Sequence, residues 1–539
     1  MADADLQRRD GTRICVGNRI LSDGSFGTVK YIGQVPPTKG IWLGVDWDEP
    51  DRGKHNGTHE GKQYFETRNP KSGSFLRPKK AEFGVSCFES LKDRYGLIEG
   101  EDAGVVTDEL FILGSNKKAT VVEMVGAKQV NQRQSKLETL KDIGLRDCLV
   151  YGNGPGCQLK EYTPNITELN LSKNLIPSWD DVARIAEQLP LLHSLNVSDN
   201  CLAIPDNLDA LRPSFAKVQF LFLNRMQYSW EQILRCSTMF PCLEQLHVCF
   251  NNLQSLSIPA QSHLPHLTLL NLDCNDLHSW EEILKVGMLP NLKTLMASEN
   301  NIDRIQFADV QLLETTKYFP KLCVLSIMRN KIGDWTSMNE LGKLATLSDL
   351  KLQGNPIWQL MDDNSVRQLI IAKIKTLLSC NNSKLTLEER KGAEIDYLKK
   401  FGQDWKKSDG NQDPSKNKPS QEFVTEHPRY QQFIDDWGAP EDSELEVKSN
   451  ALKDNLLSVI LSCPQKSEKG QITKKLPKTM SVQKVKTLVQ RLFRVETGDI
   501  ILTYKSQEVE DAEFPIDNDL RVLSFYSLEN GDTILVRWK

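Results

Sequence analysis

The stretch DRGKHNG, residues 51–57, gathers residue types that could hold a charged group. It is short and polar, and glycine stands on both sides of Lys54. Polar, glycine-rich stretches of this length also form ordinary turns. Taken alone, the stretch leaves two interpretations open: a turn that reverses the chain, or a loop that binds a ligand.

Three fragments imitate parts of protein kinases. SDGSFGTVKY resembles a glycine-rich nucleotide loop, EFG at 82–84 resembles a magnesium-binding triplet, and APE occurs at 439–441. However, Ser22 stands where the loop needs its first glycine, and neither a VAIK lysine nor an HRD catalytic loop follows. The sequence therefore argues against a kinase.

Other signals of catalysis are also weak. GNGPG at 152–156 is a partial GxGxxG motif without the strand and helix that the motif needs, so we expect a loop between domains. The eight histidines form no HExxH pair and none is in evident register with a nucleophile. We interpret His55 and His247 as binding-surface residues, and expect no enzyme activity, no cofactor and no metal site.

Composition narrows the class of protein. The net charge of −5 gives no signal for nucleic acid. MADADLQRRD has no apolar signal region, and no uninterrupted apolar run reaches the roughly 18 residues of a membrane span. Twelve cysteines without a CxxC pair fit reduced side chains. We expect a cytoplasmic protein that binds neither nucleic acid nor membrane.

The elements that must position these residues lie in segments that differ in residue composition and in hydrophobic pattern. A chain of 539 residues predicts about three or four domains. Residues 10–95 are dense in glycine, proline and aromatic residues, with short strand-like runs such as GTVKYIG and WLGVDW. This segment is predicted to be a small all-β barrel, followed by a connecting segment over 96–159.

The motifs YIG, WLGVDWDEP, GKHNG, YF and GSFLRP follow one another within about 50 residues of the first segment. In combination they resemble the CAP-Gly domain, a glycine-rich module of microtubule-binding proteins. The resemblance implies a groove that receives an acidic C-terminal tail ending in glutamates and an aromatic residue, as on α-tubulin. It favours the ligand-binding interpretation of the 51–57 stretch.

Residue roles follow from this resemblance. Lys54 would supply a point charge, and Gly53 and Gly57 would let backbone N–H groups approach a terminal carboxylate. Arg77 would add a second cation. The candidates to contact the terminal ring are Phe26, Trp42 and Phe75, although core packing is an equal alternative for the last two.

The loop departs from the usual family motif GKNDG at two positions. His55 and Asn56 stand where the motif has Asn and Asp. His55 can still donate a hydrogen bond, whereas loss of the acid makes the loop less negative. We expect the two residues to tune which tails are accepted, not to change the fold.

Residues 160–401 are predicted to form leucine-rich repeats with a helical C-terminal cap. Eight windows fit LxxLxLxxNxL, beginning at 166, 192, 218, 243, 267, 292, 322 and 347. Seven carry the asparagine, whose amide can satisfy backbone groups where the strand turns. The third has Met226 there, so either its turn is irregular or its neighbours supply the hydrogen bonds. Helix-like stretches such as SWDDVARIAEQLP would cover the convex side of an α/β solenoid.

Strand alternation predicts the concave face of this solenoid. Pattern leucines point inward, and the residues between them point outward. The outward positions in the middle of the array include an apolar strip, which we interpret as a partner-binding surface, or as a surface covered by a terminal module. The candidates are Phe220, Phe222, His247, Leu269, Met296 and Met328.

The remainder divides into a polar linker over 402–450 and an α+β module over 451–539. The linker is rich in Lys, Asp, Ser, Asn and Pro. The module shows two strand-like runs, an amphipathic SVQKVKTLVQRLF, and two more strands, with NG at a hairpin-type turn. It resembles a ubiquitin-like fold, although it ends in VRWK without Gly-Gly, so we expect no conjugation through this end.

A multidomain order of CAP-Gly domain, leucine-rich repeats and ubiquitin-like domain resembles the tubulin-folding cofactor E family. This resemblance implies a chaperone of cytoplasm and cytoskeleton that binds α-tubulin during assembly and disassembly of the α/β heterodimer. It also implies other tubulin-folding cofactors as partners, with the proteasome as a further candidate for the ubiquitin-like domain.

Two other classes stay open. A microtubule-associated linker would keep the tail groove but co-sediment with polymer, and the chain lacks an obvious coiled coil or basic polymer-binding stretch. A ubiquitin-pathway adaptor would bind proteasomal receptors without changing the amount of tubulin dimer.

Overall fold

The computed structural model describes residues 6–96, 111–113, 119–121, 135–156, 159–260, 263–441, 445, 456–494, 500–506, 513–519, 521–526 and 528–538. The chain divides into two compact units, Met1–Ala439 and Pro440–Lys539. Among the helices within these ranges, none combines the length and the apolar character needed to cross a membrane.

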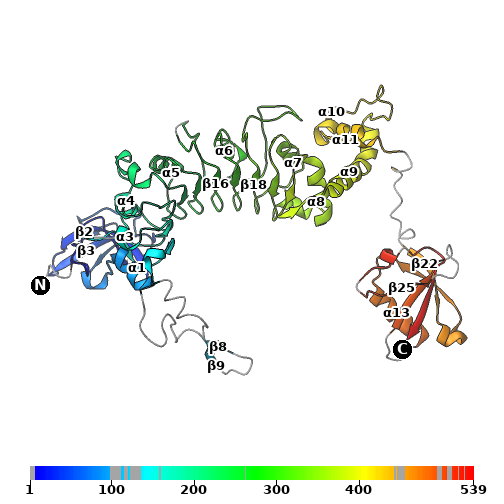
Figure 1. Cartoon of the computed structure of the whole chain (residues 1–539), viewed down its shortest axis with the longest axis horizontal. Coiled ribbons are helices and arrows are strands. Elements are labelled where there is room, and N and C mark those ends of the chain that lie inside the picture. Colours follow the sequence, from blue (N-terminus) through cyan, green and yellow to red (C-terminus); the bar gives the residue numbers. More distant parts are fainter. Residues whose placement is uncertain are drawn as a thin grey trace. The chain divides into compact units, whose positions relative to one another are not determined.

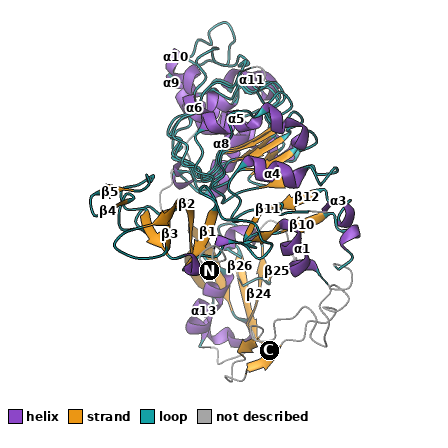
Figure 2. Cartoon of the chain, turned by 90° about the vertical axis from the view of Figure 1, so that its left-hand side faces the viewer, coloured by secondary structure: helices purple, strands orange, loops and turns teal. Residues whose placement is uncertain are grey.

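The first unit begins with an antiparallel sheet of order β1-β2-β3-β6, in which β1, β2 and β3 lie side by side (Figure 2). Alternate residues of these strands bury Ile20, Val29, Leu43, Val45 and Trp47 as a small core. A short hairpin, β4–β5, lies between β3 and β6 in the chain. The bounds are β1 Arg19–Ser22, β2 Ser25–Gln34, β3 Ile41–Trp47, β4 Thr58–His59, β5 Lys62–Gln63 and β6 Gly73–Leu76.

A short connection joins this sheet to the repeats. After the 3-10 turn η2 (Pro78–Lys80), β7 (Val85–Ser86) pairs in parallel with β11 (Val150–Gly152). Helix α1 (Cys87–Tyr95) starts at once, because Ser86 and Glu89 form a reciprocal capping box that satisfies its first N–H groups. Two further short strands, β8 (Phe111–Leu113) and β9 (Ala119–Val121), pair with each other.

The repeats form one sheet that is parallel from β10 to β20 and ends in an antiparallel strand, β21 (Figure 1). Its first strand, β10, lies inside the range predicted as a connecting segment, so that prediction is wrong there. The three-residue strand carries too little pattern to be recognised. The bounds are β10 Asp142–Gly144, β12 Glu168–Asn170, β13 Ser194–Asn196, β14 Phe220–Phe222, β15 Gln245–His247, β16 Leu269–Asn271, β17 Thr294–Met296, β18 Val324–Ser326, β19 Asp349–Lys351, β20 Ser379–Cys380 and β21 Ser383–Lys384.

The repeat asparagines hold the turns as expected. Asn174 accepts a hydrogen bond from the Val150 N–H (2.9 Å) and donates its amide N–H groups to the Leu145 and Leu171 carbonyls (2.7 and 2.9 Å). Its own backbone N–H donates to the Asn200 side chain (2.9 Å), so each asparagine also ties its repeat to the next. These buried backbone groups would otherwise lack partners.

Met226 interrupts this ladder. Its backbone N–H still donates to the Asn251 side chain (2.9 Å), which is the same bond that the Asn174 N–H makes to Asn200. Its own thioether offers only a weak acceptor. Nearby, the Tyr228 hydroxyl donates to the Leu202 carbonyl (2.8 Å) and accepts from the Trp179 indole N–H (3.2 Å). These two buried hydrogen bonds connect neighbouring repeats within the core.

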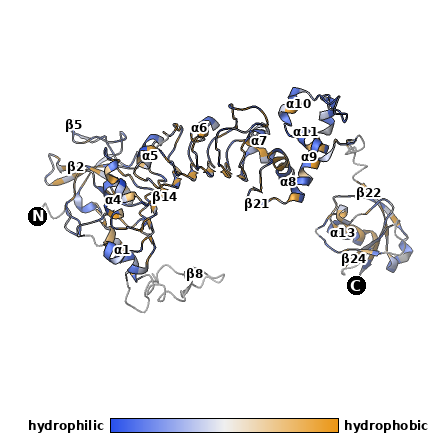
Figure 3. Cartoon of the chain, turned by 45° about the horizontal axis from the view of Figure 1, so that its top comes forward, coloured by the Kyte–Doolittle hydropathy of each residue, from blue (hydrophilic) through white to orange (hydrophobic). Residues whose placement is uncertain are grey.

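Short helices cover the convex side of the sheet (Figures 1 and 3). Ser178, Ser229 and Ser279 cap three of them, each accepting a hydrogen bond from a first-turn N–H group. The tryptophan that follows each serine is buried. The bounds are α3 Leu159–Tyr162, α4 Trp179–Ala186, α5 Trp230–Ser237, α6 Trp280–Leu284 and α7 Thr336–Leu341, with 3-10 turns at η3 Leu137–Thr139, η4 Asp209–Phe215 and η5 Pro356–Gln359.

Four helices close the C-terminal end of the solenoid: α8 (Asp363–Lys373), α9 (Leu387–Lys407), α10 (Gln421–Glu426) and α11 (Tyr430–Trp437). Helices α8 and α9 confirm the predicted helical cap, whereas the predicted linker is wrong over 402–439. There α9 continues, and α10 and α11 pack on it through a buried cluster. Its fully or nearly fully buried side chains are Leu369, Ala372, Tyr397, Leu398, Trp405, Phe423, Tyr430 and Phe433.

The second unit is a five-stranded mixed sheet of order β23-β22-β26-β24-β25 with one long helix, α13. The central pair β22–β26 is parallel, the arrangement expected of a ubiquitin-like fold. Strand β25 was not predicted. Asn530-Gly531 form a turn before β26 but not a hairpin, because β26 pairs with β22 and β24. The bounds are β22 Leu456–Ser462, η6 Pro464–Lys469, β23 Ile472–Pro477, α13 Val482–Phe493, β24 Ile500–Lys505, β25 Glu513–Ile516, η7 Leu523–Tyr526 and β26 Thr533–Trp538.

Candidate functional site

The loop that carries Lys54 is fixed to the edge of the first sheet. The Lys54 N–H donates to the Gly73 carbonyl (2.8 Å), and the Gly73 N–H donates to the His55 carbonyl (2.8 Å). A Cβ on Gly53 would clash with the backbone of Gly73 and of Lys71. Glycine is needed there because two backbone segments approach closely. The loop is therefore an ordered part of the sheet, more than a turn that reverses the chain.

Gly57 has a different reason to be glycine. Its φ is +93°, and an added Cβ would clash with the Phe65 carbonyl. Its N–H donates to Nδ1 of His55 (3.0 Å). The resemblance implies that Gly53 and Gly57 let backbone N–H groups approach a ligand carboxylate, and in the structure the N–H of Gly57 itself is used in this internal hydrogen bond.

His55 is neutral at pH 7. Burial lowers the pKa of its imidazole below 6.5, and the nearby His59 lowers it further. Because Nδ1 accepts from Gly57, the ring proton lies on Nε2. His55 can thus donate one hydrogen bond from Nε2 without adding a charge.

Lys54 and Asn56 both lie at the surface. Across the part of the chain that the structure describes, the Lys54 ammonium has neither an ion pair nor a hydrogen bond, so it is available to an anion. Asn56 has an internal role: its side chain accepts from the Thr58 hydroxyl (2.7 Å), and its carbonyl accepts from the Gln63 side-chain amide (3.0 Å). Asn56 braces the β4–β5 hairpin beside Lys54.

Phe75 lies at the centre of a group of rings beside this loop, here called the aromatic cluster. Ring centroids lie 5.1 to 6.4 Å from that of Phe75, mostly edge to face. The cluster is Tyr31, His55, His59, Tyr64, Phe65 and Phe75. Sequence reasoning selected only His55 and Phe75. The YIG and YF motifs already contained Tyr31, Tyr64 and Phe65, but only the fold brings them together.

Trp42 and Arg77 form a separate pair. The Arg77 guanidinium lies 3.8 Å from the centre of the Trp42 ring. It also donates to the carbonyls of Ile41 (3.1 Å) and Lys39 (2.8 Å). Arg77 therefore holds the start of β3, and neither residue makes a ring contact with the aromatic cluster in the described structure.

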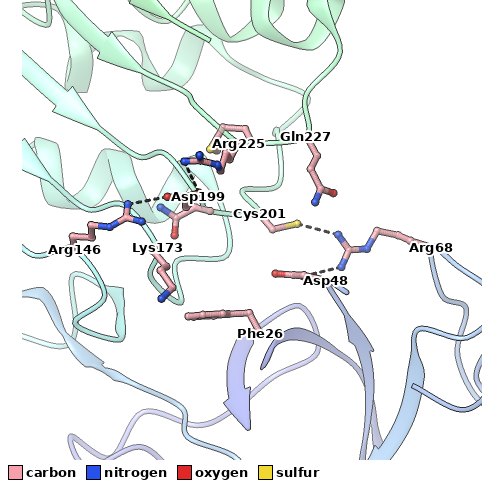
Figure 4. A pocket seen from close by; sticks show the side chains of 11 residues that line it. Phe26, Asp48, Arg68, Arg146, Lys173, Asp199, Cys201, Arg225 and Gln227 are labelled. Atoms are coloured by element: carbon pink, nitrogen blue, oxygen red, sulfur yellow. Dashed lines mark hydrogen bonds and ion pairs between the residues drawn. The ribbon is translucent and has the colours of Figure 1, made fainter. Parts of the chain in front are cut away.

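Phe26 lies elsewhere, in a pocket of about 470 Å³ between the first sheet and the first repeats (Figure 4). The Lys173 ammonium lies 5.9 Å from the centre of its ring. Arg68 spans this seam: it pairs with Asp46 and Asp48 and reaches the Cys201 sulfur (3.4 Å). The structure therefore does not bring Phe26 to the Lys54 loop.

The cations of this pocket are already neutralised. Arg146 pairs with Asp199 (2.8 Å), and Lys173 pairs with Asp147 (2.7 Å). Together with the two carboxylates on Arg68, they make the seam an ion-pair network. These ion pairs lie within the first sheet or within the repeats, and the contact of Arg68 with the Cys201 sulfur crosses between them.

The outward residues of the middle repeats lie where alternation placed them. The pattern leucines are buried, and Phe220, Phe222, His247, Leu269, Met296 and Met328 are half-buried at the surface of the sheet. Phe222 and His247 stack at 4.3 Å with an angle of 12° between their planes. Burial lowers the pKa of His247 to about 4, so this stack is uncharged at pH 7.

Strand register shows that the strip is interrupted. One row runs Phe222, His247, Asn271, Met296 and Ser326 across neighbouring strands. The neighbouring row alternates apolar and polar residues: Phe220, Gln245, Leu269, Thr294 and Val324. Met328 follows the end of β18. We use the term concave strip for the six candidate residues.

Comparison with known proteins agrees with this arrangement. The CAP-Gly domain profile matches residues 16–81. The chain is 44% identical over 522 residues to tubulin-specific chaperone E of Xenopus laevis, covering 96% of this chain and 98% of that protein. It is 39% identical over 525 residues to the Homo sapiens protein of the same name, covering 97% and 98%.

A solved structure resembles the second unit. It is the solution structure of the C-terminal ubiquitin-like domain of mouse tubulin-specific chaperone e, 42% identical. The match covers 16% of this chain and 88% of that domain, with a TM-score of 0.15. High identity to the full-length relatives, over nearly the whole of both chains, shows that the chain belongs to the tubulin-specific chaperone E family.

Proposed function

We propose that the chain is a non-enzymatic chaperone that captures α-tubulin during assembly and disassembly of the α/β-tubulin heterodimer. The observation that carries this proposal is the Lys54 loop. It presents an unpaired ammonium beside the aromatic cluster and belongs to a CAP-Gly domain. Membership of the tubulin-specific chaperone E family supports the same function.

The tail step uses the chemistry of this loop. An acidic tail that ends in an aromatic residue offers a terminal carboxylate for the Lys54 ammonium and for Nε2–H of His55. The terminal ring would lie against Phe75 and its neighbours, which offer edges and faces at ordinary stacking distances. Because His55 is neutral, the charge that recognises the tail comes from Lys54.

The body of α-tubulin would lie on the concave strip. The Phe222–His247 stack and Met296 supply uncharged, adaptable contact surface. A weak tail contact linked to a second contact raises the overall affinity by about 100-fold or more, because the second event becomes intramolecular. Capture would then need both surfaces of the first unit.

The second unit would engage other tubulin-folding cofactors, with the proteasome as a further candidate partner. This assignment rests on its ubiquitin-like topology. The proposed place of action is the cytoplasm and its cytoskeleton, where tubulin heterodimers are made and exchanged.

Incubation with purified tubulin dimer tests the proposal. Size-exclusion chromatography should show a complex of the chain with α-tubulin, together with loss of the intact dimer. Co-sedimentation with polymerised microtubules, without any loss of dimer, would support a microtubule-associated linker instead. Absence of any complex with α-tubulin would overturn the proposed function.

A further inference from the structure

The two halves of the second unit have opposite charge. Residues 456–494 contain nine Lys and Arg against a single acidic residue, Glu468. Residues 495–539 contain four Lys and Arg against ten Asp and Glu. The overall balance of the chain therefore hides a strongly basic stretch, which comprises β22, β23 and α13.

The fold places some of these cations on an edge strand of the sheet and others on α13. Strand β23 pairs with β22 and is the last strand on that side in the described sheet. Lys474 lies opposite Val459, on the face that packs against α13, and Lys475 lies opposite Ser458 on the other face. Besides Lys469 and Arg494, the exposed cations of this stretch are five residues here called the basic edge: Lys474, Lys475, Lys478, Lys484 and Arg491.

The basic edge lacks internal counter-charges. Lys486 pairs with Asp519 (2.7 Å), and Lys466 donates to the last carbonyls of α13 (2.9 and 3.3 Å), so these two cations have structural roles. Throughout the ranges that the structure describes, the five residues of the basic edge make no ion pair. Their mutual repulsion would be relieved by an anionic partner.

Protection against aggregation explains only part of this pattern. Lysines on an edge strand discourage pairing with other chains, and that role fits Lys474 and Lys475. Lys484 and Arg491 lie on α13, where no strand edge needs protection. The buried residues Val482, Val485, Val489 and Phe493 anchor this helix, so its cations are held at the surface.

The partner class follows from the backbone as well as the charge. One side of β23 carries backbone N–H and C=O groups that an extended peptide could pair with. Single-stranded nucleic acid is a poorer fit, because sequence-independent binding of single strands uses aromatic stacking as well as charge. Phe493 is the one aromatic residue in the 456–494 sequence, and it is buried.

We propose that the basic edge binds an acidic, extended polypeptide segment, whose main chain pairs with β23 and whose carboxylates contact the lysines. This surface is separate from the Lys54 loop and from the concave strip. It gives the second unit a binding site of its own, which needs no free terminal carboxylate and does not depend on the proposed capture of α-tubulin.

The test uses the full chain and an oligoglutamate peptide of about ten residues with an amidated C-terminus, so that the Lys54 loop finds no terminal carboxylate. Calorimetric titration should show binding that weakens as sodium chloride rises from about 50 to about 500 mM. The double variant Lys474→Glu/Lys475→Glu should lose about tenfold or more in affinity. Lys474→Arg/Lys475→Arg should keep it.

Lys416→Glu/Lys418→Glu is the matched control, because it makes the same change in net charge at exposed residues of the first unit. It should bind like the unchanged chain. Equal affinity of the two charge-reversed variants would overturn the proposal. So would tighter binding of a single-stranded oligonucleotide than of the peptide, or equal binding of a peptide whose backbone is N-methylated, since that peptide cannot pair with β23.

Discussion

The Lys54 loop and the concave strip are both built from rings and neutral histidines, but they are organised in opposite ways. At the loop, segments from residue 31 to residue 75 converge, and backbone hydrogen bonds to Gly73 fix the geometry. On the concave strip, each strand contributes one or two side chains in fixed register. The first arrangement suits recognition of a single chain end, and the second suits a broad surface on which a few large apolar side chains would carry most of the energy.

The largest expected effect comes from substitutions that disrupt the concave strip. Phe222→Asp/Met296→Asp places two charges among uncharged contacts and should abolish capture of α-tubulin, a loss of about 4 kcal/mol or more if both are hot spots. Pull-down with α-tubulin measures the loss, and circular dichroism should stay unchanged.

A matched control lies at the polar end of the same face. Asn170 and Asn196 accept hydrogen bonds from the Ser172 and Ser198 N–H groups (both 3.0 Å), and Asp can accept the same bonds. Asn170→Asp/Asn196→Asp should therefore capture α-tubulin normally. Undiminished pull-down by the Phe222 and Met296 double variant would contradict a role of the concave strip in binding α-tubulin.

The next largest effect comes from a substitution that distorts the backbone of the Lys54 loop. Gly57→Ala should destabilise the first sheet by about 3 kcal/mol, because it combines a positive φ with a clash against the Phe65 carbonyl. The thermal unfolding temperature and the affinity for a Glu-Glu-Tyr-ended peptide should both decrease.

Gly61→Ala separates the two causes. Gly61 also has positive φ (+76°), but an added Cβ would meet no atom within 4 Å. This variant should be destabilised by only about 1 kcal/mol. Equal effects at the two glycines would show that close packing against Phe65 is not what holds the loop.

A smaller effect sharpens the role of charge at the loop. Lys54→Ala should weaken binding of the same peptide by about 1.5 to 3 kcal/mol, through loss of one charge-assisted hydrogen bond. Lys30→Ala, at an exposed position of β2, is the control and should bind normally. An unchanged dissociation constant for Lys54→Ala would return the loop to the status of a turn.

The smallest expected effect is the loss of folding stability at acidic pH that the half-buried His247 causes. The folded pKa of His247 is about 4, below the ordinary value of 6.5, so His247 contributes stability that is present above pH 6.5 and lost as pH falls toward 4. Between pH 7 and pH 5 that loss should amount to about 1 to 2 kcal/mol. Urea unfolding at both pH values should show a stability loss that is larger by this amount in the unchanged chain and in His266→Gln, an exposed control, than in His247→Phe, where the buried His427 still contributes. An equal pH dependence in all three would contradict the assignment.

Sequence predicted most of the solenoid, because leucine and asparagine recur at near-constant spacing and each repeat solves the same local problem. It failed at the solenoid's two ends. Strand β10 has three residues, and the segment after residue 402 is polar in composition although Trp405, Phe423 and Phe433 anchor it in a core. Averages over a window hide a few large side chains spaced far apart.

The candidate sites also differ in how far they could be predicted from the sequence. Outward positions on the concave strip follow from alternation alone, so they could be read from the sequence. The aromatic cluster depends on contacts between β2, β6 and the intervening hairpin, which no local pattern encodes. The misplacement of Phe26 has the same origin, since its partner Lys173 belongs to a repeat more than a hundred residues away.

The absence of an asparagine at Met226 gives the solenoid a mechanical weak point. In a linear array, stiffness is set by the bonds between neighbours, and distortion concentrates where those bonds are fewest. The Tyr228 and Trp179 contacts restrain this point from within, but the turn itself lacks the amide that ties most other repeats together. We therefore expect bending of the array to concentrate near Phe222, where it would change the curvature of the concave strip.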